Sequence, residues 1–103
     1  ECIWLDVLED MNDLDHYILC DKTFTNSNET SNELRHMYWF PKKVLKKGDW
    51  IKLSTGSGTD STLSNSRKTT THCFYWKLGK TVWNKDGDVA TLFYINEWVT
   101  KKV

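Results

Sequence analysis

Short runs rich in aromatic and β-branched residues recur roughly every ten residues along the chain, and this spacing constrains the fold more than any other feature. We predict strands near Cys2–Val7, His16–Asp21, Leu34–Phe40, Trp50–Ser54, Cys73–Lys77, Thr81–Trp83, Val89–Ile95 and Trp98–Lys102. No stretch of about 12 residues carries apolar side chains at helical spacing. The spacing therefore predicts an all-β domain, either a sandwich or a barrel.

The segment VWNKDGDVATLFY, residues 82–94, has a polar centre that fits either a cation site or a tight turn. A calcium loop with Gly87 at its sixth position would need side-chain oxygens at Val82 and Phe93, which have none. Asp-Gly between apolar alternations instead favours a hairpin turn. Beyond it, two sets of side chains point to opposite faces of a strand, namely Val89, Thr91 and Phe93 against Ala90, Leu92 and Tyr94. We predict no metal or other cofactor.

Residues 54–72, STGSGTDSTLSNSRKTTTH, are rich in Ser, Thr and Gly and offer almost nothing to bury. We predict a long connection without regular structure. Connections of this kind inside a compact domain are either functional or simply mobile. A second polar stretch, Thr25–Glu33, predicts a surface loop.

The charges are unevenly placed although they sum to zero. The first 21 residues hold seven acids and no Lys or Arg, so the remainder carries 14 bases against seven acids. One interpretation is an electrostatic partner surface, and the other is that the two parts neutralise each other across the folded domain. No apolar run approaches the 18 residues that a transmembrane helix needs.

The sequence shows no group of residues with the spacing of a known catalytic motif. His16, His36 and His72 lie in separate segments, and none falls in a nucleophile or metalloprotease motif. Cys2, Cys20 and Cys73 form no CxxC pair; Cys20 and Cys73 lie in strand-like runs, where a thiol usually behaves as a small buried apolar group. One alternative is a single disulfide with one remaining free thiol. A second alternative is a zinc site, for which folding would have to bring His72 and Cys73 close to a distant cysteine. We predict that the chain is not an enzyme.

Two stretches of the second half carry a resemblance to a known family. MYWFPKKVLKKGDWIKLSTGSGT, residues 37–59, and FYWKLGKTVWNKDGDVATLFYINEWVTKKV, residues 74–103, together resemble the lamin tail domain, with its prokaryotic branch the most similar. The matching positions are Phe40, Pro41, Gly48, Trp83, Asn84, Gly87 and Asp88. The resemblance implies an immunoglobulin-like β-sandwich of about seven to nine antiparallel strands, formed by residues 1–103 as a single domain.

The chain also departs from that family. The strand that normally precedes position 1 is absent, so we expect a domain that lacks its first strand and offers an edge for a strand-edge dimer. The segment Ile95-Asn96-Glu97 stands where the family usually has a Gly-containing turn.

The resemblance implies a non-catalytic binding or tethering module with a protein or cell-surface partner. The chain has no heptads and ends in Lys101-Lys102-Val103 without a prenylation box, which favours a prokaryotic context over a lamin. A prokaryotic relative would be extracellular or attached to the cell surface, whereas a eukaryotic lamin would be nuclear.

Two alternative binding functions follow from particular residues. Four lysines around one turn, Lys42, Lys43, Lys46 and Lys47, suit a polyanion such as DNA, with Arg67 and Lys68 as additional cations. The alternative for this turn is a solvated surface that resists aggregation. A carbohydrate-binding function would use exposed aromatics among Tyr38, Trp39, Trp76, Trp83 and Trp98. It requires two coplanar exposed rings, whereas strand alternation turns about half of these side chains toward the core, with Trp83 as the first candidate for a core anchor.

Overall fold

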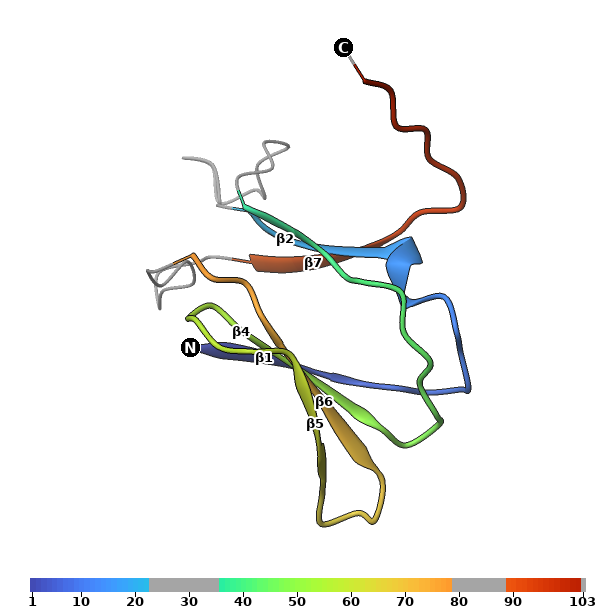
Figure 1. Ribbon diagram of the computed structural model, residues 1–103, viewed down its shortest axis with the longest axis vertical. Coiled ribbons are helices and arrows are strands. Elements are labelled where there is room, and N and C mark those ends of the chain that lie inside the picture. The colour runs from blue at the N-terminus through green and yellow to red at the C-terminus, as the bar shows by residue number, and fades with distance from the viewer. Residues whose placement is uncertain (23–35, 79–88, 103) are drawn as a thin grey trace.

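The computed structural model describes residues 1–22, 36–78 and 89–102, which form two packed β-sheets and one short 3₁₀ turn (Figure 1). The elements of the described part are β1 (Cys2–Asp6), η1 (Leu14–His16), β2 (Tyr17–Lys22), β3 (Met37–Trp39), β4 (Trp50–Ser54), β5 (Ser61–Ser64), β6 (Thr70–Tyr75) and β7 (Val89–Tyr94). The predicted all-β sandwich of seven to nine strands is confirmed, with seven strands in the described residues.

One sheet has the strand order β1-β4-β6-β5 and the other has the order β3-β2-β7. The prediction of purely antiparallel strands is wrong at one pairing, because β4 and β6 run parallel, with Trp50 opposite Thr71. The reason is the path of the chain after β4. The chain passes from β4 to β5, which lies one strand position away from β4. A hairpin turn then reverses the chain, and β6 lies between β4 and β5, where it pairs antiparallel with β5.

The core lies between the sheets and consists of buried aliphatic and aromatic side chains, namely Val7, Leu14, Leu19, Phe40, Leu45, Ile51, Leu53 and Phe74. Alternation places Ile3 and Leu5 of β1 against this core and turns Trp4 to solvent. Tyr38 of β3 contacts Phe74 of β6 across the sandwich, with ring centroids 6.5 Å apart. Each fully buried large side chain contributes about 1.5–3 kcal/mol of transfer free energy.

A tight turn at Lys46–Asp49 leads into β4. Gly48 has a φ of +91°, a conformation that is costly for any residue with a Cβ atom. The amide of Asp49 donates to the carbonyl of Lys46, and the amide of Val7 donates to the carbonyl of Asp49. The turn thereby fastens the end of β1 to the start of β4.

The residues that carry the family resemblance fall into two groups. Phe40 is buried, Pro41 is exposed, and Gly48 occupies the turn just described. The other four, Trp83, Asn84, Gly87 and Asp88, lie outside the described residues, as does the predicted strand Thr81–Trp83. The expectation that Trp83 anchors the core therefore stays a prediction.

Two predictions about secondary structure are wrong. The polar stretch 54–72 is not free of strands, because it contains β5 and the beginning of β6. All four side chains of β5 are exposed. Because the strand buries no side chain, its sequence does not need the alternation of apolar and polar residues by which a strand is predicted. Residues 98–102 form no strand; Trp98 instead packs its ring against His16 and Trp39.

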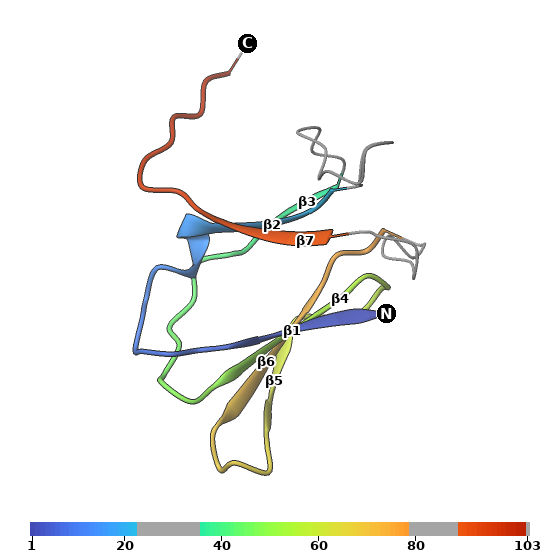
Figure 2. The same ribbon diagram turned by 180° about the vertical axis from the view of Figure 1, so that it is seen from behind.

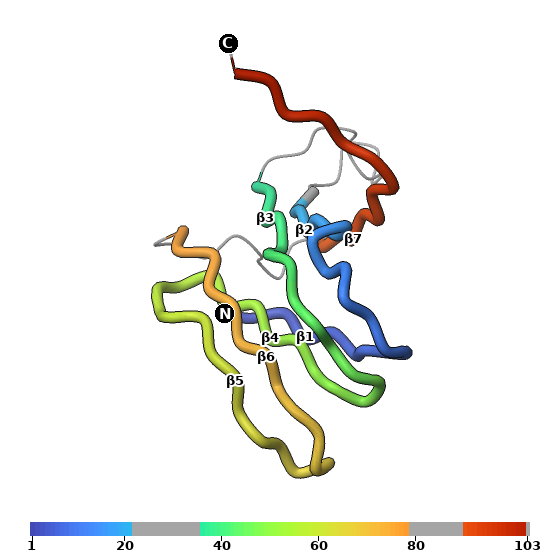
Figure 3. The backbone as a smooth tube through the Cα atoms, turned by 45° about the vertical axis from the view of Figure 1, so that its right-hand side comes forward, coloured from blue at the N-terminus to red at the C-terminus, as the bar shows by residue number. Residues whose placement is uncertain are grey.

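Within residues 1–22, 36–78 and 89–102, β1 and β7 each pair on one edge only, and we call the side where these free edges lie the open side of the sandwich. β1 ends the four-stranded sheet, β7 ends the three-stranded sheet, and the two lie on the same side of the molecule (Figures 2 and 3). The missing first strand and the strand-edge dimer stay predictions. Across the described part of the chain, no helix has the length and apolar character to cross a membrane.

Candidate functional site

The four lysines proposed for polyanion binding lie on either side of the buried Leu45. Lys46 and Lys47 are exposed on the Lys46–Asp49 turn, and Lys42 is exposed beyond Pro41. Lys43 is half-buried, with its Nζ 5.9 Å from the ring centroid of Phe74. The backbone amide of Lys47 donates a hydrogen bond to the Asp10 carboxylate at 2.8 Å, so a negative charge lies next to the lysines of this turn.

Of the aromatic side chains proposed for carbohydrate binding, the four in the described residues form no flat platform, and Trp83 lies outside the described residues. Tyr38 and Trp76 pack against the hydrophobic core, with their centroids 5.9 Å apart. Trp39 and Trp98 are close to perpendicular, at 86°, and the Trp39 indole donates to the carbonyl of Asp15. The contact between Trp39 and Trp98 holds the segment after β7 against the sheet, so these two indoles have a structural role.

A different exposed surface lies on the outer face of the four-stranded sheet, and the sequence analysis did not single it out. Because Ile3 and Leu5 face inward on β1 and Ile51 and Leu53 do so on β4, their neighbours face solvent. We name it the tryptophan face, and it consists of Trp4, Asp6, Trp50, Lys52 and Arg67. The signal that would have found it is this pair of alternations, each with a Trp at an outward position.

The rings and charges of the tryptophan face are in direct contact. Trp4 and Trp50 meet edge to face, with centroids 6.0 Å apart and planes at 88°. The Lys52 ammonium lies 5.4 Å from the Trp4 ring, and the Arg67 guanidinium lies 5.6 Å from the Trp50 ring. These cation–π geometries hold two positive charges at the surface of the rings.

Trp4 remains 53% exposed despite these contacts. An open hollow of about 510 Å³ lies beside it, lined by Trp4, Leu5, Asp6, Trp50 and Arg67. Arg67 Nη1 is 3.8 Å from Asp6 Oδ1, a long and exposed ion pair that leaves the guanidinium accessible to another carboxylate. Trp and Arg are among the residue types most enriched at the energetically dominant positions of protein–protein interfaces.

Arg67 reaches the face from the hairpin turn between β5 and β6, and Asn65 organises that turn. Asn65 Oδ1 accepts hydrogen bonds from the amides of Arg67 and Thr69, at 3.0 and 3.2 Å, and from the Thr69 hydroxyl at 3.0 Å. The Thr69 hydroxyl also contacts the carbonyl of Gly48 at 2.8 Å. The turn is thus fixed both internally and to the start of β4.

Two Asp–His pairs form that the sequence did not predict. His72 Nε2 lies 2.8 Å from Asp49 Oδ2, and both side chains are buried. His36 Nδ1 lies 3.1 Å from Asp21 Oδ1. Carboxylate–imidazole pairs orient catalytic bases in some enzymes, but the burial of His72 keeps its ring away from solvent and from any substrate. The Asp49–His72 pair is therefore a structural contact, whereas the His36 side chain is 22% exposed.

The pKa of Asp49 reflects its surroundings. Burial acts to raise the pKa, but hydrogen bonds from His72 and from the amides of Lys46 and Thr70, together with the charge of His72, lower it below its ordinary value. The net direction follows from the number of donors that the carboxylate meets. Asp49 is therefore held as a carboxylate at the junction of the turn and β6.

The cysteines and possible metal ligands can also be placed. Cys20 and Cys73 are buried, as predicted, and Cys2 is exposed. Among residues 1–22, 36–78 and 89–102, no three His, Cys, Asp or Glu side chains gather as a metal site would require.

Comparisons of the chain with protein-family models, with curated proteins and with solved structures give no match. The tryptophan face is therefore interpreted from its own geometry and chemistry.

Proposed function

We propose that this domain is a non-catalytic binding or tethering module, as its resemblance to lamin tail domains implies, and that the tryptophan face is its contact surface. One observation carries the proposal: Trp4 is more than half exposed beside Trp50, and each ring carries a cation. Leaving a large apolar ring in water forgoes the stabilisation that its burial would provide. A partner that covers Trp4 recovers that free energy.

The charges define the partner's chemistry. Lys52 and Arg67 outnumber the single acid, Asp6, on the tryptophan face. A protein surface with carboxylates around an apolar centre complements this arrangement, because guanidinium groups bind carboxylates with two parallel hydrogen bonds. The perpendicular rings give a sugar chain no flat platform, so carbohydrate binding has less support.

Polyanion binding at the lysine turn is a second candidate, favoured by the exposure of Lys42, Lys46 and Lys47. Asp10 beside the turn weakens this candidate by contributing a negative charge. The prokaryotic setting, with an extracellular or cell-surface location, stays a prediction from the resemblance.

The test is fluorescence anisotropy with three labelled probes: a peptide with Leu-Leu flanked by Glu residues, a thymine-only single-stranded DNA, and a neutral glucan oligosaccharide. We expect the acidic peptide to bind most tightly. Trp4→Ala should weaken that binding by about thirtyfold, the effect of removing an interface hot spot worth about 2 kcal/mol.

The matched control is Trp39→Ala, which removes a similarly exposed indole from the other sheet and should leave peptide binding unchanged. The proposal fails if the peptide does not bind, or if Trp4→Ala and Trp39→Ala behave alike. DNA binding that falls steeply with salt, and that is lost when Lys42, Lys46 and Lys47 are changed to Ser, supports the second candidate instead.

A further inference from the structure

We propose that the cavity between the two sheets is a binding site for a small amphiphile with an apolar tail and a cationic head, of the alkylamine class. This cavity borders the tryptophan face, because Leu5 and Asp6 line both hollows, but Tyr17, Leu14 and Leu92 line only the cavity, and the two proposals are tested with different ligands. The cavity has a volume of about 260 Å³ and lies on the open side of the sandwich.

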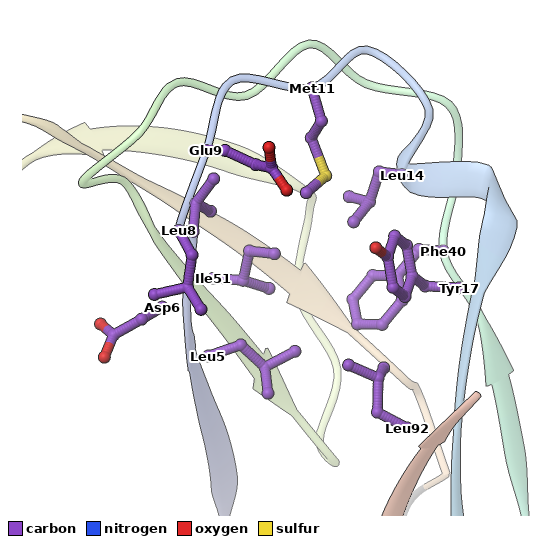
Figure 4. A pocket seen from close by; sticks show the side chains of 11 residues that line it. Leu5, Asp6, Leu8, Glu9, Met11, Leu14, Tyr17, Phe40, Ile51 and Leu92 are labelled. Carbon is purple, nitrogen blue, oxygen red and sulfur yellow. The ribbon is translucent and has the colours of Figure 1, made fainter. Parts of the chain in front are cut away.

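The walls of the cavity are apolar and come from both sheets. Leu5 of β1 and Ile51 of β4 line one wall, and Tyr17 and Leu92 of the other sheet lie across from them (Figure 4). Val7, Met11, Leu14 and Phe40 complete the lining. An apolar cavity of this kind favours a hydrocarbon chain, because each methylene that leaves water contributes transfer free energy.

The opening is formed by side chains that remain partly in water. Leu92 on the edge strand β7 is 43% exposed, and Leu8, which follows β1, is exposed. Since β1 and β7 are edge strands on the same side of the molecule, no strand in the described residues closes the cavity between them. A ligand tail can therefore enter between the two strands.

The polar groups at the cavity are acidic. The Glu9 carboxylate points toward Met11 at one end, whereas the Asp6 carboxylate points away (Figure 4). Burial, followed by the negative charges of Asp13 and Glu9 and the proximity of Tyr94, raises the pKa of the Tyr17 hydroxyl above its ordinary value. Burial disfavours a charge of either sign, but the carboxylates of Asp13 and Glu9 add a negative field that favours a positive head group over a negative one.

In the part of the chain that the structure describes, no lysine or arginine side chain lines the cavity. The first 21 residues, which supply most of the lining, contain no Lys or Arg. Lys46 and Arg67 belong to neighbouring hollows instead. An ammonium head group can thus lie against Glu9 while its alkyl tail lies against Leu5, Leu14 and Leu92.

The experiment is a titration of the isotope-labelled protein with hexylamine, octylamine and decylamine, followed by NMR. We expect methyl shifts at Leu5, Leu14 and Leu92, and binding that strengthens about fourfold for each methylene that enters the cavity. Octanol and octanoate, which have the same tail with a neutral and a negative head, should bind more weakly than octylamine.

Two variants locate the site. Leu92→Trp should fill the opening and abolish binding, while Leu63→Trp, a comparably exposed Leu on β5, should leave binding unchanged. Glu9→Gln should weaken the binding of octylamine by about threefold, as expected for the loss of one exposed ion pair, and should leave the binding of octanol unchanged. Glu97→Gln removes one negative charge elsewhere and serves as the control.

The proposal is overturned if octanoate binds as tightly as octylamine, or if the shifted methyl groups lie outside the cavity. Equal binding by wild type and Leu92→Trp also overturns it, provided that thermal unfolding shows the variant to be folded. Loss of peptide binding at the tryptophan face has no bearing on these outcomes.

Discussion

At the scale of single residues, Gly48 shows how a backbone requirement is met. Its φ of +91° is strained for any other residue, and an added Cβ atom would lie 3.2 Å from the Thr69 methyl group. We expect Gly48→Ala to lower the free energy of unfolding by about 1–3 kcal/mol, measured by urea denaturation.

Gly56→Ala is the matched control, since a Cβ atom there meets nothing within 4 Å. This substitution should leave stability unchanged or raise it slightly, by up to about 1 kcal/mol, because it restricts the unfolded chain. Equal losses in the two variants would show that the turn conformation at Gly48 has no special role.

Asp49 gives the domain an acid-dependent component of stability. Because its pKa is lower in the folded than in the unfolded chain, its contribution is complete above the ordinary pKa and is lost as the pH falls through the lowered value. Urea denaturation between pH 6 and pH 2 should show this loss in the wild type. Asp49→Asn should be less stable at pH 6 and should have a shallower slope below about pH 4. Identical slopes would contradict the prediction.

At the scale of elements, the hairpin of β5 and β6 joins stability to the proposed binding surface. Asn65→Ala removes the acceptor of two amide hydrogen bonds, from Arg67 and Thr69, in the turn that carries Arg67. We expect faster hydrogen exchange at the Thr69 amide and a loss of about 1–3 kcal/mol in unfolding free energy. Peptide binding at the tryptophan face should also weaken.

The neighbouring Ser66→Ala provides the comparison, because Ser66 is exposed in the same turn. It should change neither hydrogen exchange nor binding. If Asn65→Ala leaves the exchange of the Thr69 amide as slow as in the wild type, the turn does not depend on Asn65.

A strand can be predicted from the sequence when it buries one face, because burial requires apolar side chains at every second residue. β4 is predicted with its observed bounds, because Ile51 and Leu53 give it one apolar face that the core buries. β5 was missed because it lies at a sheet edge and buries no side chain. Trp98 was assigned to a strand because its apolar surroundings resemble one, although ring packing alone explains them.

The binding surfaces were less predictable than the strands. Alternation can show that Trp4 and Trp50 face outward together, but the position of Arg67 depends on the unpredicted hairpin. The Asp49–His72 contact likewise requires the parallel pairing of β4 with β6, which no local pattern indicates. Long-range register, rather than local propensity, was the missing information.

At the scale of the whole molecule, Tyr38 links the two sheets and should control stability in alkali. Burial, followed by the charge of Asp60, raises its pKa to about 12. A raised pKa means that its contribution is complete below the ordinary value of 10.0 and is lost as the pH rises toward 12. Urea denaturation above pH 10 should therefore show a steeper decline in the wild type than in Tyr38→Phe. Parallel declines would exclude this role for Tyr38.

The strand order has a consequence for how the chain is made in the cell. Cys2 at the start of β1 pairs with Ser54, and Tyr17 of β2 pairs with Tyr94 at the end of β7. Contacts so distant in sequence form slowly, because a long loop must close before they stabilise anything. During synthesis, β1 emerges well before its partner, and the second sheet cannot be completed until β7 has left the ribosome. The nascent domain therefore exposes its apolar N-terminal strands until β4 and β7 have been translated, and during that interval contacts with other chains compete with folding.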